Sequence, residues 1–343
     1  MTAAPGHNPT FAARGPAERL AEAAPFLLVP LLAAAGWLAI PQGSSWLTLT
    51  VSGLAMGMMI FIMASGLTLI FGLMDVINFG HGAFVSVGAF VGVGALAALD
   101  GLTGAPSPAL NALALALAAA AAMLATGALG WAFERAIVRP VYGAHLKQIL
   151  VTMGGLIVIE QLILVIWGPS EIFFSRPEAF KGALTFAGAA IEKYRLVAVG
   201  VGLALFLAMR TALRATRIGL IVRAGVENRE MVEALGYRLR VVFVGVFVAG
   251  SALAGLGGVM WGLYEEVITA HMGGALMVLV FIVVIIGGLG SVEGCFLGAL
   301  LVGLMQNYVA FLEPKLALIS NIGLMVAILM WRPQGMIPVV KAK

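Results

Sequence analysis

The feature that most constrains this chain is a succession of long apolar stretches separated by short polar segments. A helix needs roughly 20 apolar residues to cross a bilayer, because in lipid the backbone must satisfy its own hydrogen bonds. The pattern therefore predicts an all-α polytopic membrane protein with about ten transmembrane crossings. The expected crossings are residues 25–41, 47–72, 82–99, 109–133, 148–168, 194–210, 239–262, 275–290, 294–312 and 315–331.

The composition indicates the same class. Hydrophobic residues make up 62% of the 343 residues, charged residues make up 10%, and the mean hydropathy is +1.06. Soluble domains carry about 25% charged residues, and a soluble fold of this length could not hide so much apolar surface. We expect residues 1–24 to form a disordered cytoplasmic tail, 25–338 to form one transmembrane domain and 339–343 to form a short cytoplasmic tail. No small-residue cleavage pattern follows the first apolar stretch, which indicates an uncleaved span.

Several kinds of chemistry have no signal in the sequence. The single cysteine, Cys295, rules out a disulfide within the chain and a cysteine-rich metal site, and the four histidines are scattered. There is no phosphate-binding loop of the form Gly-x-x-x-x-Gly-Lys-Ser/Thr, no nucleophile elbow and no paired-histidine zinc motif. We therefore expect a chain that is not an enzyme and that holds no metal or cofactor of its own.

Basic residues predict the orientation, because Lys and Arg concentrate in cytoplasmic loops. Residues 210–240 carry seven arginines against three glutamates, and the segment 134–147 adds Arg135, Arg139 and Lys147. Placing both segments in the cytoplasm puts both termini inside and the segment 169–193 outside. The two ends of the chain, which also carry basic residues, agree with this arrangement.

Ten crossings can divide into two halves of five, and an odd number per half gives inverted repeats, a common transporter device. Residues 72–82 and 262–273 carry an echo that fits this relation. Both run Gly-Leu, then an acid, a β-branched pair, a His and a Gly. The echo is short, so a true repeat and a chance similarity both stay open.

The first candidate site lies between the second and third expected crossings, where Asp75, Asn78 and His81 stand among glycines. Unwound backbone at membrane depth is tolerated only where protein or a water-filled cavity satisfies it. Half-helix ends at such a place can meet a charged substrate. The segment is therefore either part of a substrate pathway, with Gly80 and Gly82 as hinges, or a tight turn whose polar residues cap the next helix.

A second candidate site is Glu160 with Gln161, about twelve residues into the fifth crossing. A carboxylate at that depth is costly unless it is paired, protonated or facing water. The pair either contacts a substrate or a proton, or Glu160 is protonated and bonds a neighbouring helix. On the outer side, Glu265 and Glu266 with His271 either receive a cationic group or a partner, or are solvated loop charges.

The third feature is the basic loop 211–238. Within it, Asn228 can cap a short helix over residues 229–235, and Gly236 can end that helix in the left-handed conformation. Its apolar residues would share one face: Met231, Val232 and Leu235. Such a helix either lies on the membrane or docks into a partner's groove, and the alternative is a solvated positive loop.

The fourth feature is the glycine-rich segment 287–294, which joins the eighth and ninth crossings. Gly287, Gly288 and Gly290 permit a sharp turn and close backbone contact, and we treat them as candidate hinges. The segment lacks the Lys-Ser/Thr pair of a phosphate-binding loop and lies between two spans. We therefore expect no nucleotide to bind there.

Together these segments resemble the permeases of branched-chain amino acid ABC importers, the LivH/LivM family, over about residues 48–338. Residues 78–82 are closer to the LivH branch than to the LivM branch. The resemblance rests on four motifs in order: Gly66-Leu67-Thr68-Leu69-Ile70-Phe71-Gly72 with Val76-Ile77-Asn78-Phe79-Gly80-His81-Gly82; Gly219 with Arg223-Ala224 and Glu227-Asn228 up to Ala234-Leu235-Gly236; Gly287-Gly288-Leu289-Gly290-Ser291 with Gly294; and Arg332-Pro333-Gln334-Gly335.

The resemblance implies a machine of several subunits in a bacterial inner membrane. A periplasmic binding protein would deliver an amino acid or a related small carboxylate or amide to two permease subunits. Two cytoplasmic ATPases, which would hold ATP and Mg²⁺, would drive the transfer. This chain would pair with a LivM-like subunit or with itself, contact membrane lipid and bind no nucleic acid. The residues that would couple it to an ATPase are Arg223, Glu227, Asn228, Glu230, Leu235 and Gly236.

Two departures from the family leave the substrate open. Many members have a proline shortly before the outer Met-Gly, where this chain has Ala270 and His271, and Glu265-Glu266 makes the same loop more acidic. Since the family includes importers of urea, short amides and aromatic acids, the substrate class stays undecided. From another functional class, an ion-driven secondary transporter would explain inverted halves and Glu160 but not the basic loop.

Overall fold

The computed structural model describes residues 16–216, 219–221, 224 and 229–338. Within this part of the chain, eight helices have the length and apolarity needed to cross a membrane. Two shorter apolar helices, Ala23–Ala39 within α1 and α11 (Met272–Gly287), match the remaining two expected crossings. The eight long ones are α2 (Gly43–Met74), α3 (His81–Ala98), α5 (Pro108–Phe133) continued to Val141, α6 (His145–Trp167), α7 (Lys193–Ala215), α10 (Leu239–Glu265), α12 (Val292–Leu312) and α13 (Ala317–Trp331) together with the turn that precedes it from Pro314. The all-α polytopic membrane fold expected from the sequence is confirmed.

The first helix begins before the crossing expected at residues 25–41, since α1 (Pro16–Ala39) begins at Pro16. Proline is favoured at the first helical position, and the alanines, Leu20 and glutamates that follow it are good helix formers. Residues 1–15 and 339–343 lie outside the described part of the chain.

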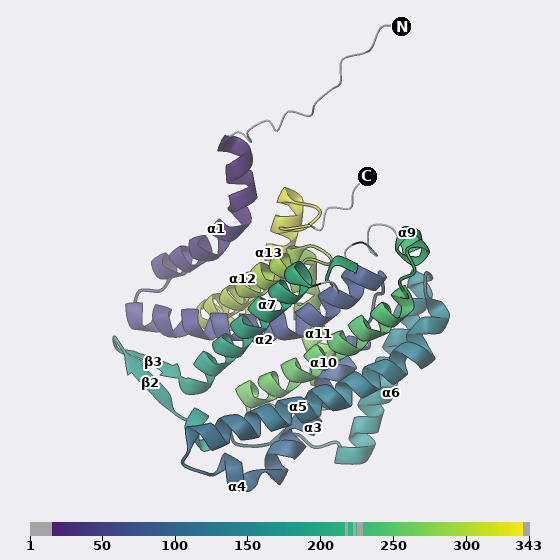
Figure 1. Ribbon diagram of the computed structural model, residues 1–343. Helices are drawn as coiled ribbons and strands as arrows, with labels where there is room; N and C mark the ends of the chain where they lie inside the picture. Colours follow the sequence, from purple (N-terminus) through teal and green to yellow (C-terminus); the bar gives the residue numbers. More distant parts are fainter. Residues whose placement is uncertain (1–15, 217–218, 222–223, 225–228, 339–343) are drawn as a thin grey trace, which may run out of the picture.

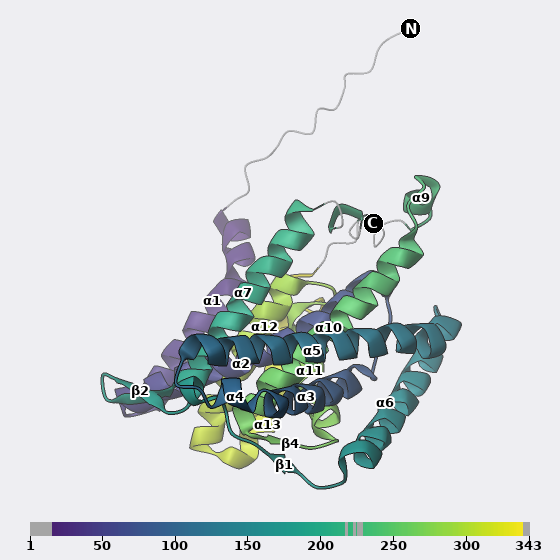
Figure 2. The same cartoon turned by 60° about the horizontal axis from the view of Figure 1, so that its bottom comes forward.

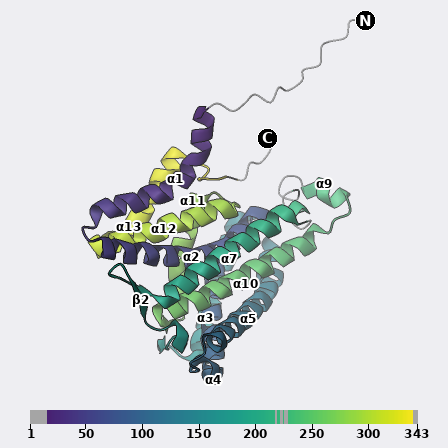
Figure 3. The ribbon, with the colours of Figure 1, turned by 60° about the vertical axis from the view of Figure 1, so that its left-hand side comes forward.

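Helix α2 is the centre of the bundle (Figure 1). It is apolar on all sides, and its residues from Ser52 to Ile70 are almost all buried. A helix without a polar face is typical of a position surrounded by other helices. Here α12, α10 and α7 pack directly against it, and α1 lies along the outside of α12 (Figure 3).

Two ends of the molecule can be distinguished. At one end is the β2–β3 hairpin (Ala183–Phe186 and Ala189–Glu192), and at the other is the short helix α9 (Arg229–Ala234) (Figures 1 and 2). Arg195 donates to Ser52 near the start of α2 and to Glu192 of the hairpin at 2.9 Å. Helix α10 begins beside α9 and ends at the hairpin, so α2 and α10 run in opposite directions.

The chain breaks in the same way after α2 and after α10. Asp75 and Glu266 both adopt the left-handed conformation, with φ of 53° and 57°. Their amides donate to the carbonyls of Phe71 at 2.9 Å and Gly262 at 2.8 Å. Seven residues after each acid stands a glycine, where the next helix has just begun. The two breaks lie at opposite ends of the molecule, as inverted halves require.

The two glycines meet in the interior. A Cβ added to Gly82 at the start of α3 would lie 2.8 Å from the carbonyl oxygen of Gly273 at the start of α11, and a Cβ on Gly273 would collide with the carbonyl of Gly82. Ser86 completes the contact by donating to the carbonyl of Ala270 at 2.8 Å and accepting from the amide of Gly273 at 3.0 Å. The N-termini of two broken helices are thus held together inside the bundle.

This contact generates a prediction. Gly82→Ala should lower the melting temperature of the detergent-purified protein, because relieving such overpacking costs about 1–3 kcal/mol. The matched control on the same helix is Gly94→Ala, since nothing lies within 4 Å of a Cβ there. Equal melting temperatures for the two variants, measured by scanning fluorimetry, would contradict the close approach.

Candidate functional site

The residues predicted for the substrate pathway do not converge on one site. Asp75 is exposed at the α9 end, with a carboxylate oxygen 3.8 Å from His145 Nε2. Asn78 and His81 are fully buried. Glu160 and Gln161 lie on α6, near the start of α11. The two candidate sites of the sequence analysis therefore occupy separate places in the fold, and Asp75 is exposed whereas Asn78 and His81 are buried.

The break between α2 and α3 is held by neighbouring side chains. The amides of Ile77 and Phe79 donate to Gln148 Oε1 at 3.4 Å and Thr152 Oγ1 at 3.1 Å, both on α6. His81 Nε2 lies 2.9 Å from the carbonyl oxygen of Met63. These contacts satisfy extended backbone within the protein, which is the condition for tolerating it at membrane depth.

The alternative in which polar residues of this break cap the next helix was wrong. Neither Asp75 nor Asn78 caps α3, whose N-cap is Gly80 without a side-chain hydrogen bond. Asp75 instead ends α2 through its own left-handed backbone. The side-chain amide of Asn78 has no hydrogen-bond partner in the described part of the chain. Gly80 is not in the left-handed region, and its space is limited by the Phe133 ring.

Glu160 forms a pair with His271. Its carboxylate lies 2.9 Å from His271 Nδ1 and is only 12% exposed, whereas the histidine side chain is 64% exposed. His271 therefore contacts α6, and not the acids Glu265 and Glu266 with which the sequence grouped it. Gly274, one turn into α11, leaves room for the carboxylate, because a Cβ there would lie 3.0 Å from Glu160 Oε1.

The pair joins two sets of exposed residues, one on α6 and one on α11, which we together call the α6–α11 face. Within each helix the members recur at spacings of three or four residues, so each set lies along one side of its helix. Most are apolar, and Gln161, Glu160 and His271 interrupt them. The exposed members are Met153, Ile157 and Gln161 of α6 with His271, Ala275 and Val278 of α11.

At the hairpin end, Arg176 fixes the long loop between α6 and α7. Its guanidinium donates to the carbonyls of Leu263 at 2.7 Å and Tyr264 at 2.6 Å, and it pairs with Glu192 at 2.8 Å and Glu266 at 3.7 Å. A cation at these carbonyls satisfies the C-terminus of α10 and its dipole. Strand β1 (Ile172–Phe173) pairs with β4 (Val267–Ile268) beside it.

At the α9 end, three of the sequence motifs meet at one turn. Gly288 and Gly290 are left-handed, with φ of 98° and 82°, and Gly72 at the end of α2 packs against Gly290. Gly335 in the C-terminal segment packs against Gly288 with a φ of 87°. The positive φ values explain two of the predicted hinge glycines, whereas Gly287 is an ordinary helical residue in close contact with Gly294.

Hydrogen bonds close this turn. The amides of Met336 and Ile337 donate to the carbonyls of Ile286 at 2.9 Å and Gly287 at 3.1 Å, and Arg332 donates to the carbonyl of Met336 at 2.8 Å. The C-terminal segment thus bonds the last carbonyls of α11. The glycine-rich motif and the C-terminal motif thus join residues that are 50 positions apart in the sequence, such as Ile286 and Met336.

Two arginines at the end of α7 attach the basic loop to the same turn. Arg210 and Arg214 lie 3.0 Å and 2.7 Å from a carboxylate oxygen of Glu293, which stands in the first turn of α12. The start of the loop is therefore anchored to the bundle. Its remaining part leads to α9.

Helix α9 projects at the edge of the molecule (Figures 1 and 3). Gly236 ends it with a φ of 88°, and the amide of Tyr237 donates to the carbonyl of Val232 at 3.3 Å. Its apolar residues do not share one face as expected. Val232 is 4% exposed and faces the bundle, whereas Met231 and Leu235 are 61% and 70% exposed. Of the predicted coupling residues, Arg223, Glu227 and Asn228 lie outside the described residues, and Glu230 is described only by its helical backbone.

Comparisons with known proteins give the family. The profile described as "Branched-chain amino acid transport system / permease component" matches residues 49–329. The chain is 26% identical to the high-affinity branched-chain amino acid transport system permease protein BraD of Pseudomonas aeruginosa over 307 residues, 87% of this chain and 97% of that protein. It is also 26% identical to the permease protein LivH of Escherichia coli over 293 residues, 83% of this chain and 93% of that protein.

The chain therefore belongs to the family of permease components of branched-chain amino acid transport systems. It is a multi-pass membrane permease subunit of the LivH-like ABC type, and the resemblance seen in the sequence is confirmed. Permeases of this kind work with ATPase and binding-protein partners. The secondary-transporter alternative is not supported.

The turn at the α9 end generates a second prediction. Gly335→Ala should loosen it, because a left-handed backbone costs a residue with a Cβ about 1–2 kcal/mol and that Cβ would also collide with Gly288. Amide hydrogen exchange should accelerate at residues 286–291. Gly323→Ala on α13 is the control, since nothing lies within 4 Å of its Cβ. Unchanged exchange in the Gly335 variant would show that the turn does not depend on this contact.

Proposed function

We propose that this chain forms one half of the membrane pathway of an ABC importer, with the α6–α11 face lining that pathway opposite a second permease. The observation that carries the proposal is the Glu160–His271 pair on an otherwise apolar exposed surface. Polar groups at membrane depth are costly unless they face protein or a water-filled cavity. A second subunit that covers this face, leaving water or substrate at the pair, removes that cost.

The second subunit is a LivM-like permease in this proposal, and a second copy of the chain is the alternative. The relatives BraD and LivH are named as parts of branched-chain amino acid transport systems. An amino acid carries one ammonium and one carboxylate. Glu160 offers an acceptor for the ammonium of such a zwitterion, and the other ring nitrogen of His271 offers a further polar contact. The proposed cargo is therefore an amino acid or a related small carboxylate or amide.

The α9 end is the cytoplasmic side in this proposal. Arg210 and Arg214 at the end of α7 and Arg238 and Arg240 at the start of α10 lie there, in line with the preference of Lys and Arg for cytoplasmic loops. The β2–β3 hairpin and the loop fixed by Arg176 then face the periplasm, where a binding protein would dock. Both termini would be cytoplasmic, in a bacterial inner membrane.

Helix α9 is the proposed contact with the ATPase, which would hold ATP and Mg²⁺ on its own subunit. Met231 and Leu235 are exposed at adjacent positions of its outer face, while Val232 fixes its inner face to the bundle. A movement of the ATPase would be passed along α10, which starts directly after α9 and ends at the second break. That route ends near His271, three residues beyond β4.

The coupling proposal predicts the effect of Leu235→Glu. A charge at the centre of a protein contact removes apolar burial, and such positions contribute about 2 kcal/mol or more. ATP-driven uptake in proteoliposomes should fall at least tenfold, and the variant should retain less ATPase during purification. The control is Leu220→Glu, an equally non-conservative change at a leucine that is 62% exposed earlier in the same loop. Equal losses in both variants would mean that α9 has no special part in coupling.

The pathway proposal predicts that Glu160→Gln lowers uptake by about tenfold, because a hydrogen bond to a charged partner contributes about 1.5–3 kcal/mol. His271→Gln should act in the same direction. Assembly with the ATPases and basal ATP hydrolysis should be retained. Glu178→Gln, at an exposed carboxylate of the hairpin end, is the control.

Normal uptake by the Glu160 and His271 variants would remove this pair from the pathway. Uptake by the chain alone in liposomes without ATP would overturn the importer proposal itself. The two outcomes are distinguishable, since the first leaves ATP dependence intact.

A further inference from the structure

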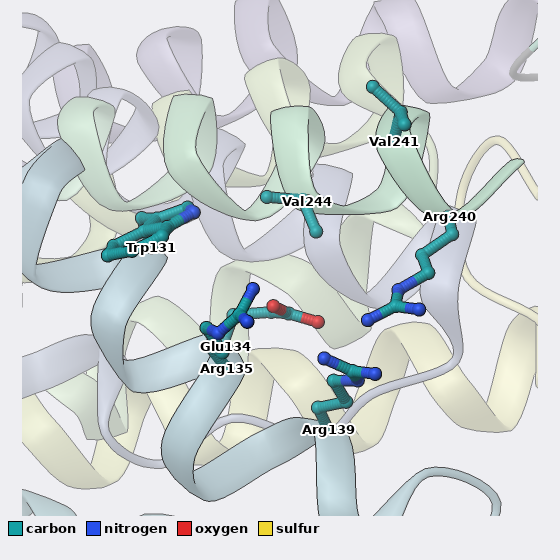
Figure 4. Close-up of a pocket in the computed structure, with 7 residues that line it drawn as sticks. All are labelled: Trp131, Glu134, Arg135, Arg139, Arg240, Val241 and Val244. Atoms are coloured by element: carbon teal, nitrogen blue, oxygen red, sulfur yellow. The ribbon is translucent and has the colours of Figure 1, made fainter. Parts of the chain in front are cut away.

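A pocket of about 370 Å³ opens where the end of α5 meets the start of α10 (Figure 4). Its walls come from the last turn of α5, from the π-helical turn Glu134–Val138 that follows it and from the first residues of α10. The lining residues are Trp131, Glu134, Arg135, Arg139, Arg240, Val241 and Val244. None of them belongs to the α6–α11 face.

The charge of the pocket is strongly positive. Three guanidinium groups face it, two from one wall and Arg240 from the other (Figure 4). Within the part of the chain that the structure describes, none of the three makes an ion pair, and Arg135 only lies over the Trp131 ring at 5.9 Å. The one carboxylate, Glu134, is 3% exposed and accepts a hydrogen bond from Tyr142. The pocket is thus built with more positive charge than its own acid can balance.

The surroundings of the pocket are apolar and open. Trp131 is 51% exposed and Val241 is 65% exposed, and Leu124, two turns back along α5, is 75% exposed. This surface continues along α5 and α10 towards the middle of the bundle. Tryptophan is enriched where a helix leaves the hydrocarbon layer, and α5 with its extension spans Pro108–Val141. The guanidinium groups therefore lie at the depth of lipid headgroups, with an acyl-chain surface beside them.

We propose that this pocket binds the phosphate of an anionic phospholipid in the leaflet at the α9 end. Guanidinium groups bind phosphate oxygens in a bidentate manner, and basic pockets between transmembrane helices take up anionic headgroups. The acyl chains lie against Trp131, Val241 and Val244. A phosphate held by Arg135 and Arg139 on one side and Arg240 on the other bridges α5 to α10.

A soluble phosphate could bind the same guanidinium groups. The apolar surface beside them distinguishes a phospholipid from a free phosphate. A free anion would use the guanidinium groups alone. A lipid also covers Trp131 and Val241, which are 51% and 65% exposed at the mouth of the pocket (Figure 4). The bridge would link the helix that carries α9 to its neighbour, so bound lipid should raise the stability of the assembled transporter.

The test uses the complete transporter in nanodiscs of phosphatidylcholine, with or without phosphatidylglycerol. Phosphatidylglycerol should raise the melting temperature of the wild type and should remain bound in native mass spectrometry. A variant with Arg135→Gln, Arg139→Gln and Arg240→Gln should bind it at least tenfold more weakly and lose the temperature shift. The control removes the same charge at exposed lysines, through Lys147→Gln, Lys181→Gln and Lys315→Gln, and should keep both effects.

Single Arg240→Gln provides a second readout if the triple variant does not fold, and it should lose part of the shift. Protection by inorganic phosphate in detergent equal to that by phosphatidylglycerol would assign the pocket to a soluble anion and overturn the proposal. Loss of the ATPase subunits from the pocket variant with unchanged lipid binding would assign it to a protein contact, which also overturns it. Equal lipid binding and equal melting-temperature shifts in the pocket variant and the lysine control would also overturn the proposal.

Discussion

Close contact between glycine backbones is the interaction on which the rest of this structure depends. Lipid provides no hydrophobic force between helices, so packing must supply the attraction. At Gly82 and Gly273 the two broken helices touch main chain to main chain, and Gly88 of α3 meets Gly255 of α10 in the same way. A side chain at these positions would separate α3 from both partners. The breaks would then lose the neighbours that satisfy them.

Polar side chains in the interior form hydrogen bonds with backbone groups that the glycine contacts do not satisfy. Gln148 and Thr152 receive the amides of the first break, and Ser86 joins the two helix starts. Arg176 performs the corresponding task for the last carbonyls of α10. These partners allow the molecule to interrupt two of its helices, because backbone groups freed at a break must be satisfied within the protein. The exposed Glu160–His271 pair is different in kind, since its histidine faces outward.

Much of the fold could be predicted from the sequence because every crossing obeys one rule. It must satisfy its own backbone hydrogen bonds in lipid, so it is an apolar helix long enough to span the bilayer. Apolar length predicted the crossings, and the echo between residues 72–82 and 262–273 fits the matching breaks. What could not be predicted were contacts between distant residues. No periodicity connects Glu160 with His271, which are 111 residues apart. Arg176 lies in the segment 169–193 that the sequence places outside, and only the end of α10 beside it reveals its role. The sequence also could not show that Asp75 is exposed while Asn78 is buried, because a motif carries no information on depth or exposure.

The bonds from Met336 and Ile337 to the end of α11 have a consequence for the order of assembly. A chain made from its N-terminus delivers α11 and α12 to the membrane well before these two amides exist. The last carbonyls of α11 must therefore wait for their partners until the chain has been made as far as Ile337. Met336 and Ile337 then close a turn whose other residues entered the membrane earlier.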